Sequence, residues 1–134
     1  MKLSSKSITA IKFFIDLGEH YKEGYVNLND IAKRKDLSKK FLEQIVPLYR
    51  NSHLLNVNRG NQGGYQLNKN PKDITLLNII KYTENSFEKV DYQDNVINFL
   101  IDNLDEKIIN YLTSISLSDI LEKQKEDYQN NYII

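Results

Sequence analysis

The chain has 134 residues, of which 27% are charged and 40% hydrophobic, as is typical of one compact domain with a short appendage. It contains no cysteine, which excludes disulfides, thiolate-bound zinc and a cysteine-held iron–sulfur cluster. No apolar run approaches the ~20 residues that span a membrane, and the first residues lack the apolar core of a secretory signal, so we expect a cytoplasmic protein.

The net charge of zero conceals a division along the chain. Residues 1–82 contain 14 Lys and Arg against 7 Asp and Glu, whereas residues 83–134 contain 4 against 11. Such a division indicates a basic nucleic-acid-binding part joined to an acidic part with another role. Chance clustering of solvated charges gives the same totals, so charge alone does not decide between the two interpretations.

Apolar residues at helical spacing predict a first helix over residues 5–22, capped by Ser4 or Ser5 and ended by Gly24. The residues expected to face the core are Ile8, Ile11, Phe14, Ile15 and Gly18. A short second helix is expected to begin at a cap on Asn29. Its outward face carries the basic run Lys33, Arg34 and Lys35.

Ser38 is expected to cap a third helix of about a dozen residues. Its apolar stripe, expected to be buried, consists of Leu42, Ile45, Val46 and Tyr49. The opposite face is polar or charged. Pro47 removes the backbone donor that would bond the Glu43 carbonyl, so we expect a loosened last turn and a working face confined to residues 38–46.

The following residues predict a hairpin and another helix. Alternating apolar residues flank a Gly- and Asn-rich turn within residues 54–68, which is typical of a β-hairpin. Pro71 and Thr75 introduce a fourth helix, and residues 85–94 are polar enough for a linker.

The acidic half begins with a long helix predicted over residues 95–115. Its apolar stripe is wide, and a helix this apolar beyond a linker requires a partner. We therefore expect two copies of the chain to dimerise through Val96, Leu100, Leu104, Ile108 and Leu112. A last helix is capped by Ser116 or Ser118, and a polar stretch follows it.

Helix, short helix, turn, helix and hairpin follow one another in the order of a winged helix-turn-helix. The DNA major groove admits one α-helix, whose N-terminal residues reach base edges. Arg59 at the hairpin tip, beside Gly60, is suited to a narrow minor groove. The candidate DNA-contacting residues are Lys2, Lys6, Ser38, Lys39, Lys40, Glu43, Gln44, Arg50, Arg59, Gly60 and Gln62. Lys33 and Arg34 are further candidates for phosphate contacts.

Each of these residues also has an ordinary structural explanation. Ser38 is a helix cap in either case, Glu43 can be a solvated surface residue, and Arg59 can be a charge on a sheet edge. The predicted fold is mainly α with a small β-hairpin wing. It comprises a winged helix-turn-helix domain over residues 1–84, a linker over 85–94, and a dimerisation helix and tail over 95–134.

The sequence resembles the bacterial winged helix-turn-helix regulators of the IscR, NsrR and CymR type, the Rrf-two family, and within it the cluster-free CymR-like repressors. Two motifs carry the resemblance: Leu37-Ser38-Lys39-Lys40-Phe41-Leu42-Glu43-Gln44-Ile45 and Arg59-Gly60-Asn61-Gln62-Gly63-Gly64-Tyr65. The resemblance implies a homodimer that places a recognition helix in each major groove and a wing in each minor groove of double-stranded DNA. It maps the DNA contacts onto Ser38, Lys40, Glu43, Gln44 and Arg59.

The chain departs from the family at two places. Cluster-sensing members carry three cysteines in the segment that corresponds to residues 86–95, and this chain has none there. A cofactor-free regulator is therefore expected, with no bound metal. His53 stands where the family usually has glycine after the recognition helix, so we expect a mildly strained helix end.

The resemblance also suggests a function for the chain. It implies a homodimeric repressor, with control of cysteine metabolism as its finer expectation. By the same analogy, the carboxylate of Ile134 is hypothesised to engage cysteine synthase; a disordered or packed terminus is the alternative.

Two other functions were weighed against DNA-binding regulation. The first is a winged-helix interaction module that binds a partner enzyme and has lost DNA binding. The second is an enzyme, which the sequence disfavours because His20 and His53 are its two histidines and neither lies near a nucleophile in a recognisable motif.

Overall fold

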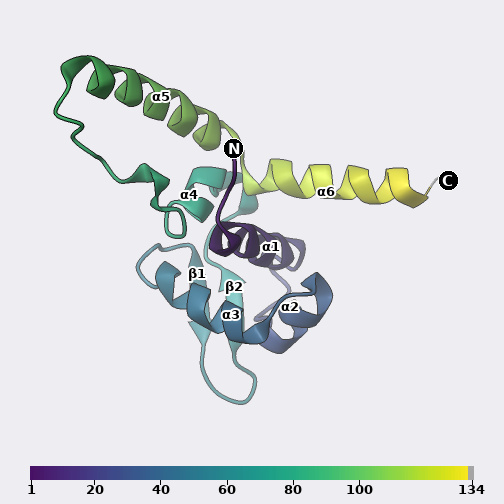
Figure 1. Cartoon of the computed structure of the whole chain (residues 1–134). Coiled ribbons are helices and arrows are strands. Elements are labelled where there is room, and N and C mark those ends of the chain that lie inside the picture. The colour runs from purple at the N-terminus through teal and green to yellow at the C-terminus, as the bar shows by residue number, and fades with distance from the viewer. Residues whose placement is uncertain (133–134) are drawn as a thin grey trace.

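The computed structural model describes residues 1–132 and is mainly helical, with a single antiparallel hairpin within that range. The α-helices are α1 (Ser5–Glu19), α2 (Leu28–Lys35), α3 (Lys39–Ile45), α4 (Leu76–Ile80), α5 (Asn95–Ser114) and α6 (Leu117–Tyr132). The strands are β1 (Leu55–Asn58) and β2 (Gly64–Leu67), and the 3₁₀ turns are η1 (Val46–Tyr49), η2 (Pro71–Asp73) and η3 (Asn85–Phe87). Figure 1 shows α1–α3 and the hairpin forming one domain, from which α5 and α6 project in different directions. The predicted fold class is confirmed.

Helix α1 is the centre of the core. Phe13, Phe14 and Leu17 are buried and meet the apolar faces of α2, α3 and α4. The ring of Phe14 lies edge-on to Tyr49, with ring centroids 5.0 Å apart. Ile8, which we expected in the core, is 42% exposed, because the buried face of α1 is centred on Ala10, Phe13 and Leu17 instead of on Ile8.

The helix boundaries differ from the prediction at two places. Helix α1 is capped by Ser4 as expected, but it ends at Glu19, and a turn with positive φ at Lys22 and Gly24 follows it. The cap of α2 is Asn27 instead of Asn29, because the Asn27 side chain accepts a hydrogen bond from the Asp30 N–H at 2.9 Å.

The third helix is divided in the way that Pro47 predicted. Helix α3 has seven residues and continues into the 3₁₀ turn η1, where the proline lies near the start. The predicted stripe of Leu42, Ile45, Val46 and Tyr49 is buried. His53 has a positive φ of 62°, so the left-handed residue expected after this helix is present without a glycine.

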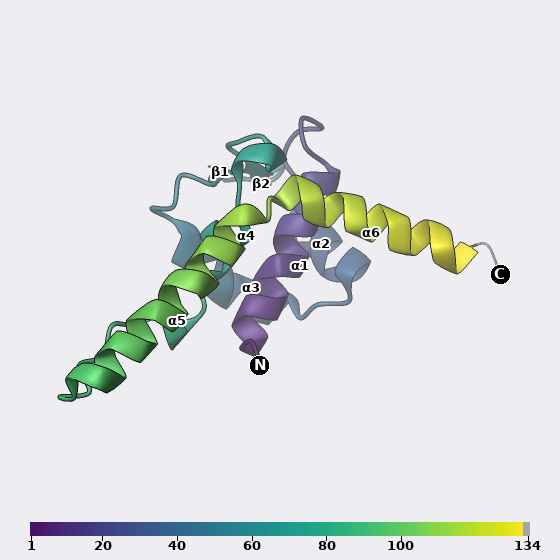
Figure 2. The same ribbon diagram turned by 90° about the horizontal axis from the view of Figure 1, so that it is seen from above.

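The second half of the chain consists of α5 and α6, which meet at an elbow. At this elbow the Leu76 N–H donates to the Ile115 carbonyl at 2.8 Å, and the Leu117 N–H donates to the Ile74 carbonyl at 2.7 Å. Helix α6 then packs along α1 and continues to Tyr132, beyond the short last helix that we expected. Figure 2 shows that α5 and α6 leave the elbow on different sides of α1. None of the helices in the described part of the chain has the length and apolar character needed to cross a membrane.

Candidate DNA-binding surface

The surface of interest begins at the N-terminus of α3. Ser38 caps this helix, because its hydroxyl oxygen accepts a hydrogen bond from the Phe41 N–H at 3.2 Å. The side chains on the outer side of the helix are exposed: Lys39, Lys40, Glu43 and Gln44. Since the opposite stripe is buried, the helix has one solvent-facing side, and that side is made of groups that bond base edges and phosphates.

Two of the predicted reading residues interact with each other. The Lys39 ammonium lies 3.9 Å from a Glu43 carboxylate oxygen, and both side chains are about half exposed. An exposed pair at this distance contributes little to stability, so the Glu43 carboxylate remains free to exchange this partner for a base.

The hairpin forms the wing, and it is attached to the start of α2. Leu55 is paired with Leu67 and Asn58 with Gly64 across the strands. Val26, just before α2, exchanges two backbone hydrogen bonds with Tyr65, at 2.8 and 2.9 Å. This isolated β-bridge holds the wing at a defined position beside the helix-turn-helix.

The structure brings the two arginines of the predicted site to one groove. This groove has a volume of about 620 Å³ and lies between η1 and the hairpin, with Arg50, Arg59 and Gly60 among its lining residues. Its walls include the apolar residues Pro47 and Val57. Two arginines that line a partly apolar groove suit contacts with nearby DNA phosphates, since arginine binds phosphate bidentately.

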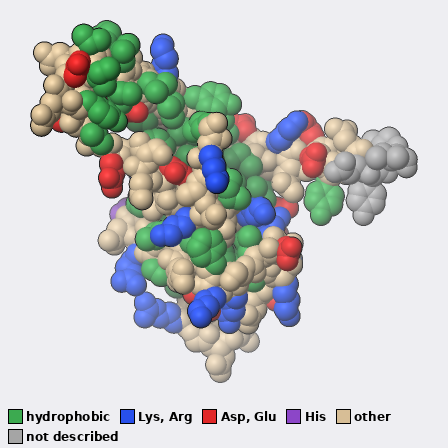
Figure 3. All heavy atoms as spheres, in the orientation of Figure 1, with side chains coloured by type: hydrophobic (Ala, Val, Ile, Leu, Met, Phe, Trp, Pro, Cys, Tyr) green, Lys and Arg blue, Asp and Glu red, His purple; other side chains and the backbone are tan. Residues whose placement is uncertain are grey.

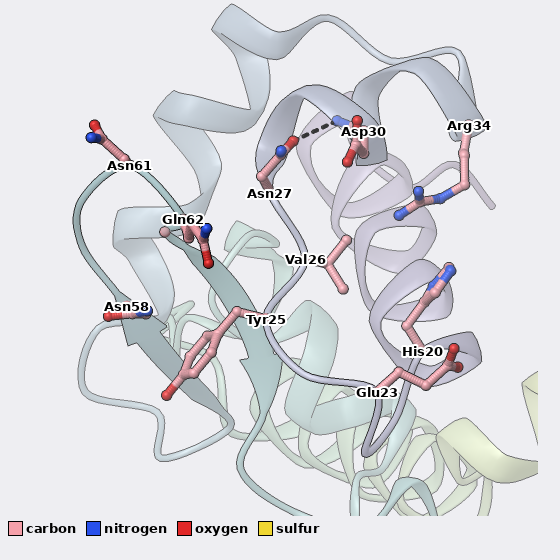
Figure 4. Close-up of a pocket in the computed structure, with 11 residues that line it drawn as sticks. His20, Glu23, Tyr25, Val26, Asn27, Asp30, Arg34, Asn58, Asn61 and Gln62 are labelled. Carbon is pink, nitrogen blue, oxygen red and sulfur yellow. Dashed lines mark hydrogen bonds between the residues drawn. The ribbon is translucent and has the colours of Figure 1, made fainter.

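Gln62 lies elsewhere on the wing. It lines a different hollow, of about 570 Å³, between the wing loop, the end of α1 and the start of α2. Figure 4 shows Gln62, Asn58 and Tyr25 on the wing side of this hollow, with His20 and Arg34 across from them. The structure therefore does not place Gln62 in the groove that contains Arg59.

Three further lysines that we expected to contact phosphates are exposed. Lys2 and Lys6 are exposed at the start of α1, and Lys33 is exposed on α2. Figure 3 shows Lys and Arg side chains over the domain that carries α1–α3 and the wing, and hydrophobic side chains over α5.

Arg34 is not a free phosphate contact, which corrects our expectation for it. Its Nε and Nη2 atoms each donate to an oxygen of Asp16 at 2.9 Å, and the Asp16 side chain is fully buried. This hydrogen-bonded pair raises the pKa of the Arg34 guanidinium. The sequence signal that we overlooked is a lone acid, Asp16, within the apolar run of α1.

The expected dimerisation residues of α5 also fall into two groups. Val96, Leu100 and Leu104 are each more than half exposed, together with Phe99 and Tyr111. Leu112 is buried in the core of its own chain and Ile108 packs against that core. Leu112 is therefore unavailable to a partner, and the exposed apolar face of α5 is made of Val96, Phe99, Leu100, Leu104 and Tyr111.

No set of metal ligands is apparent in the described residues. The whole chain has no cysteine, and residues 1–132 contain no group of three or more His, Asp or Glu side chains placed to hold a metal ion. The residues present do not fit a cysteine-bound iron–sulfur cluster, which needs several thiolate ligands.

The chain is similar to known regulators over most of its length. The profile of the Rrf2 family, described as an iron-dependent transcriptional regulator, matches residues 3–123. The regulator IscR of Photorhabdus laumondii is 30% identical over 93% of this chain and 82% of its own length. The regulator CymR of Bacillus subtilis is 36% identical over 68% of this chain and 66% of its own length.

Solved structures of such regulators share the fold. CymR (YrzC), the global cysteine regulator of B. subtilis, superposes with a TM-score of 0.76 at 30% identity, over 92% of this chain and 98% of that one. The T. potens IscR structure gives a TM-score of 0.77 at 34% identity, over 95% and 90% of the two chains. Both superpositions cover more than nine tenths of this chain.

Proposed function

This chain belongs to the Rrf2 family of DNA-binding transcriptional regulators, and we propose that it acts as a homodimeric repressor that reads DNA through α3 and the wing without a metal cofactor. In this proposal α3 of each copy enters a major groove and Arg59 enters the adjoining minor groove. The two half-sites then lie about 34–36 Å apart, or a multiple of that distance.

One observation carries the DNA-reading part of the proposal. The predicted contact residues of α3 are exposed on the face opposite its buried stripe, and Arg50 and Arg59 line one groove beside it. A helix with hydrogen-bonding groups on its exposed face and a wing with an arginine at its tip are the two parts that such a domain uses to reach the major and minor grooves. Because Gln62 lies on another side of the wing loop, we assign it no direct base contact.

Two substitutions test this assignment, because each should impair DNA binding in a different way. Glu43→Ala should relax base choice by about 1–3 kcal/mol at the position that Glu43 reads, while Arg59→Ala should weaken binding to all sites. Gel-shift titrations over a panel of single-base variants of the bound site separate the two patterns. Full, specific binding by both variants would show that α3 and the wing are not the reading surface.

The exposed face of α5 supports the homodimer. Val96, Phe99, Leu100, Leu104 and Tyr111 are exposed on one side of a helix of 20 residues, a side that also carries Asn103 and Lys107. An exposed apolar patch of this kind marks an interaction site, and a two-fold pair of such helices buries the same face of both copies. Sedimentation of the purified chain tests the proposal: a dimer is expected, and a monomer at micromolar concentration would contradict it.

Control of cysteine metabolism is the finer part of the proposal. Its support is the similarity to CymR, whose B. subtilis structure is described as that of the global cysteine regulator. Mapping of bound sites across the genome of the source organism tests it directly. We expect enrichment at genes of sulfur assimilation, and enrichment at unrelated genes would contradict this part while leaving DNA binding intact.

The hypothesised contact with cysteine synthase involves Ile134, which lies outside the described residues. Its support is the similarity of the chain to CymR. A pull-down with the full chain and with a chain that lacks residues 131–134 tests it. Equal capture of the synthase by both chains, or capture by neither, would dispose of the hypothesis.

A further inference from the structure

A partly buried polar cluster joins the turn after α4 to the start of α1. One oxygen of Glu84, Oε2, accepts hydrogen bonds from the Ser4 N–H at 3.1 Å and from the Ser7 hydroxyl at 2.7 Å. The Ser7 hydroxyl also lies 2.9 Å from the Thr83 hydroxyl. Ser7 and Thr83 are buried, whereas Glu84 is partly exposed, so the bond between the two hydroxyl groups is shielded from water and the bonds to the carboxylate are shielded only in part.

This cluster determines where the first residues of the chain run. Ser4 is the cap of α1, and its N–H is the last backbone donor before the helix. Lys2 lies two residues before Ser4 and Lys6 two residues after it, and both are exposed. A carboxylate that bonds the Ser4 N–H therefore fixes the chain between two lysines that we assign to DNA phosphates.

The helix that begins at this cluster also contacts the rest of the domain. Helix α1 packs on α3, and Figure 1 shows the first residues of the chain on the side of α1 away from α3 in that view. A negative group at the N-terminus of a helix is favourable through the helix dipole. The Glu84 carboxylate occupies this position, so the start of α1 is held by the chain itself and not by a ligand.

We propose that Glu84 is a positioning residue for DNA binding, which acts through Lys2 and Lys6 by holding the first turn of α1 in place. This inference rests on the proposed function, because it assumes that both lysines contact phosphates. A flexible N-terminal segment would have to be ordered on binding, and that entropic cost would weaken every phosphate contact made by it.

The direction in which Glu84→Ala changes DNA affinity distinguishes a positioning role from a simple effect of charge. Removal of a negative charge from a DNA-binding protein strengthens binding in general, because repulsion of phosphates is relieved. Glu84→Ala should instead weaken binding by about three- to tenfold, equally for all sequences, and should make the salt dependence shallower. Glu84→Gln should bind nearly as the parent does, because both hydrogen bonds use one oxygen and an amide oxygen can accept them.

A matched control is available in the same segment. Asp91 accepts hydrogen bonds from the Gln93 N–H at 2.8 Å and the Asn98 side chain at 3.0 Å. Asp91→Ala removes the same charge and a similar number of hydrogen bonds at a distance from α1. It should leave DNA binding unchanged or slightly tighter.

The deciding experiment is a double-mutant cycle measured by salt-titrated gel shift on one bound duplex. Glu84→Ala is compared in the parent chain and in the Lys2→Ala/Lys6→Ala chain, after thermal unfolding has shown that each variant is folded at the assay temperature. In the parent chain we expect Glu84→Ala to weaken DNA binding about three- to tenfold. In the Lys2→Ala/Lys6→Ala chain we expect it to change the affinity less than twofold, which is of order 0.4 kcal/mol. Ser7→Ala, which removes the 2.7 Å bond with little change of shape, should give the same pattern if Glu84→Ala is too unstable to assay.

Two results would overturn the inference. Equal losses in both backgrounds would mean that Glu84 acts through overall stability or through other contacts. Unchanged binding by the Lys2→Ala/Lys6→Ala chain would mean that no phosphate contact exists for Glu84 to support. In either case, specific binding by the parent chain would leave the proposed function standing, whereas absence of such binding would refute that function itself.

Discussion

The buried ion pair between Asp16 and Arg34 ties α1 to α2. Both oxygens of Asp16 are used by Arg34, and His20 at the end of α1 lies 3.5 Å from one of them. A carboxylate that is fully withdrawn from water depends on such partners, because an unpaired buried charge is costly. The pair therefore helps to set the angle between the first two helices and, through them, the position of α3.

Arg34→Ala should destabilise the protein more than Asp16→Ala. Loss of the arginine leaves a buried carboxylate unpaired, at a cost of about 2–3 kcal/mol once the 40% exposure of the Arg34 side chain is allowed for. Loss of Asp16 leaves a cation that water already reaches. Urea unfolding of the two variants measures the difference, and equal destabilisation would contradict the account.

The stability contributed by Glu84 should depend on pH. The Ser7 hydroxyl and then the Ser4 N–H lower the pKa of this carboxyl below its ordinary value of 4.5. A carboxyl with a lowered folded-state pKa contributes stability that is fully present above its unfolded-state pKa and is lost as pH falls through the folded-state value.

The free energy of unfolding of the parent chain should therefore exceed that of Glu84→Ala at neutral pH. The difference should shrink as the pH is lowered below 4.5. Urea titrations at a series of pH values provide the measurement. A difference that stayed constant down to the acid-unfolding region would show that the carboxylate form contributes nothing.

At this scale the sequence was informative for local interactions and uninformative for distant ones. Ser38 was identified as a cap because its partner is three residues away. Arg34 was misassigned because its partner, Asp16, is 18 residues away on another helix. The spacing of apolar residues along one helix does not show which side chains of two different helices meet. The cluster of Glu84 with Ser4 and Ser7 joins residues about 80 positions apart and has no signal in the sequence.

The conformation of the wing explains two of the glycines in the motif of residues 59–65. Gly60 has a φ of 116°, a conformation that other residues adopt rarely, and it allows the turn beside Arg59. Gly64 lies so close to the chain before α2 that a Cβ atom there would be 2.3 Å from the Val26 carbonyl oxygen. The first glycine thus shapes the tip of the hairpin, and the second permits its attachment to the domain.

Gly64→Ala should detach the wing without unfolding the helices. The added methyl group cannot be accommodated against the backbone at Val26, so the two hydrogen bonds between Val26 and Tyr65 should be lost. We expect rapid amide exchange in residues 55–67 and slow exchange in α1. Retained protection across the hairpin would contradict the close approach seen in the structure.

The end of a helix could be predicted from the sequence where a single residue determines it. Pro47 predicted the loosened end of the recognition helix, which the structure shows as η1. The full length of α6 was not predicted, because its outer half is polar and the residues that pack against the core, Leu117, Ile120 and Leu121, lie in its first turns.

At the scale of the whole molecule, the exposed face of α5 and the basic surface of the winged domain lie on different parts of the chain (Figure 3). Their separation fits the proposal that one surface binds a second copy while the other binds DNA. The charge division along the sequence corresponds to these two parts, since residues 1–82 are basic and residues 83–134 are acidic. The sequence therefore indicated two parts of different charge, but it did not indicate that Leu112 belongs to the core of its own chain.

Leu100→Glu should convert the protein to a monomer. Leu100 is 54% exposed on the apolar face of α5, and a two-fold interface would bring two introduced carboxylates close together in a desolvated contact. Sedimentation velocity measures the change, with Asp102→Asn on another side of α5 as the control. If the Leu100→Glu chain sedimented as the parent does, α5 would not be the interface.

Selection of binding sites from random-sequence DNA by the unmodified chain tests the central claim most directly. Two copies of α3 and the wing related by a two-fold axis should enrich an inverted repeat, with half-site centres about 10–10.5 base pairs apart or a multiple of that spacing. An enriched site without internal symmetry, or no enrichment at low salt, would contradict the claim that a homodimer reads DNA through these surfaces.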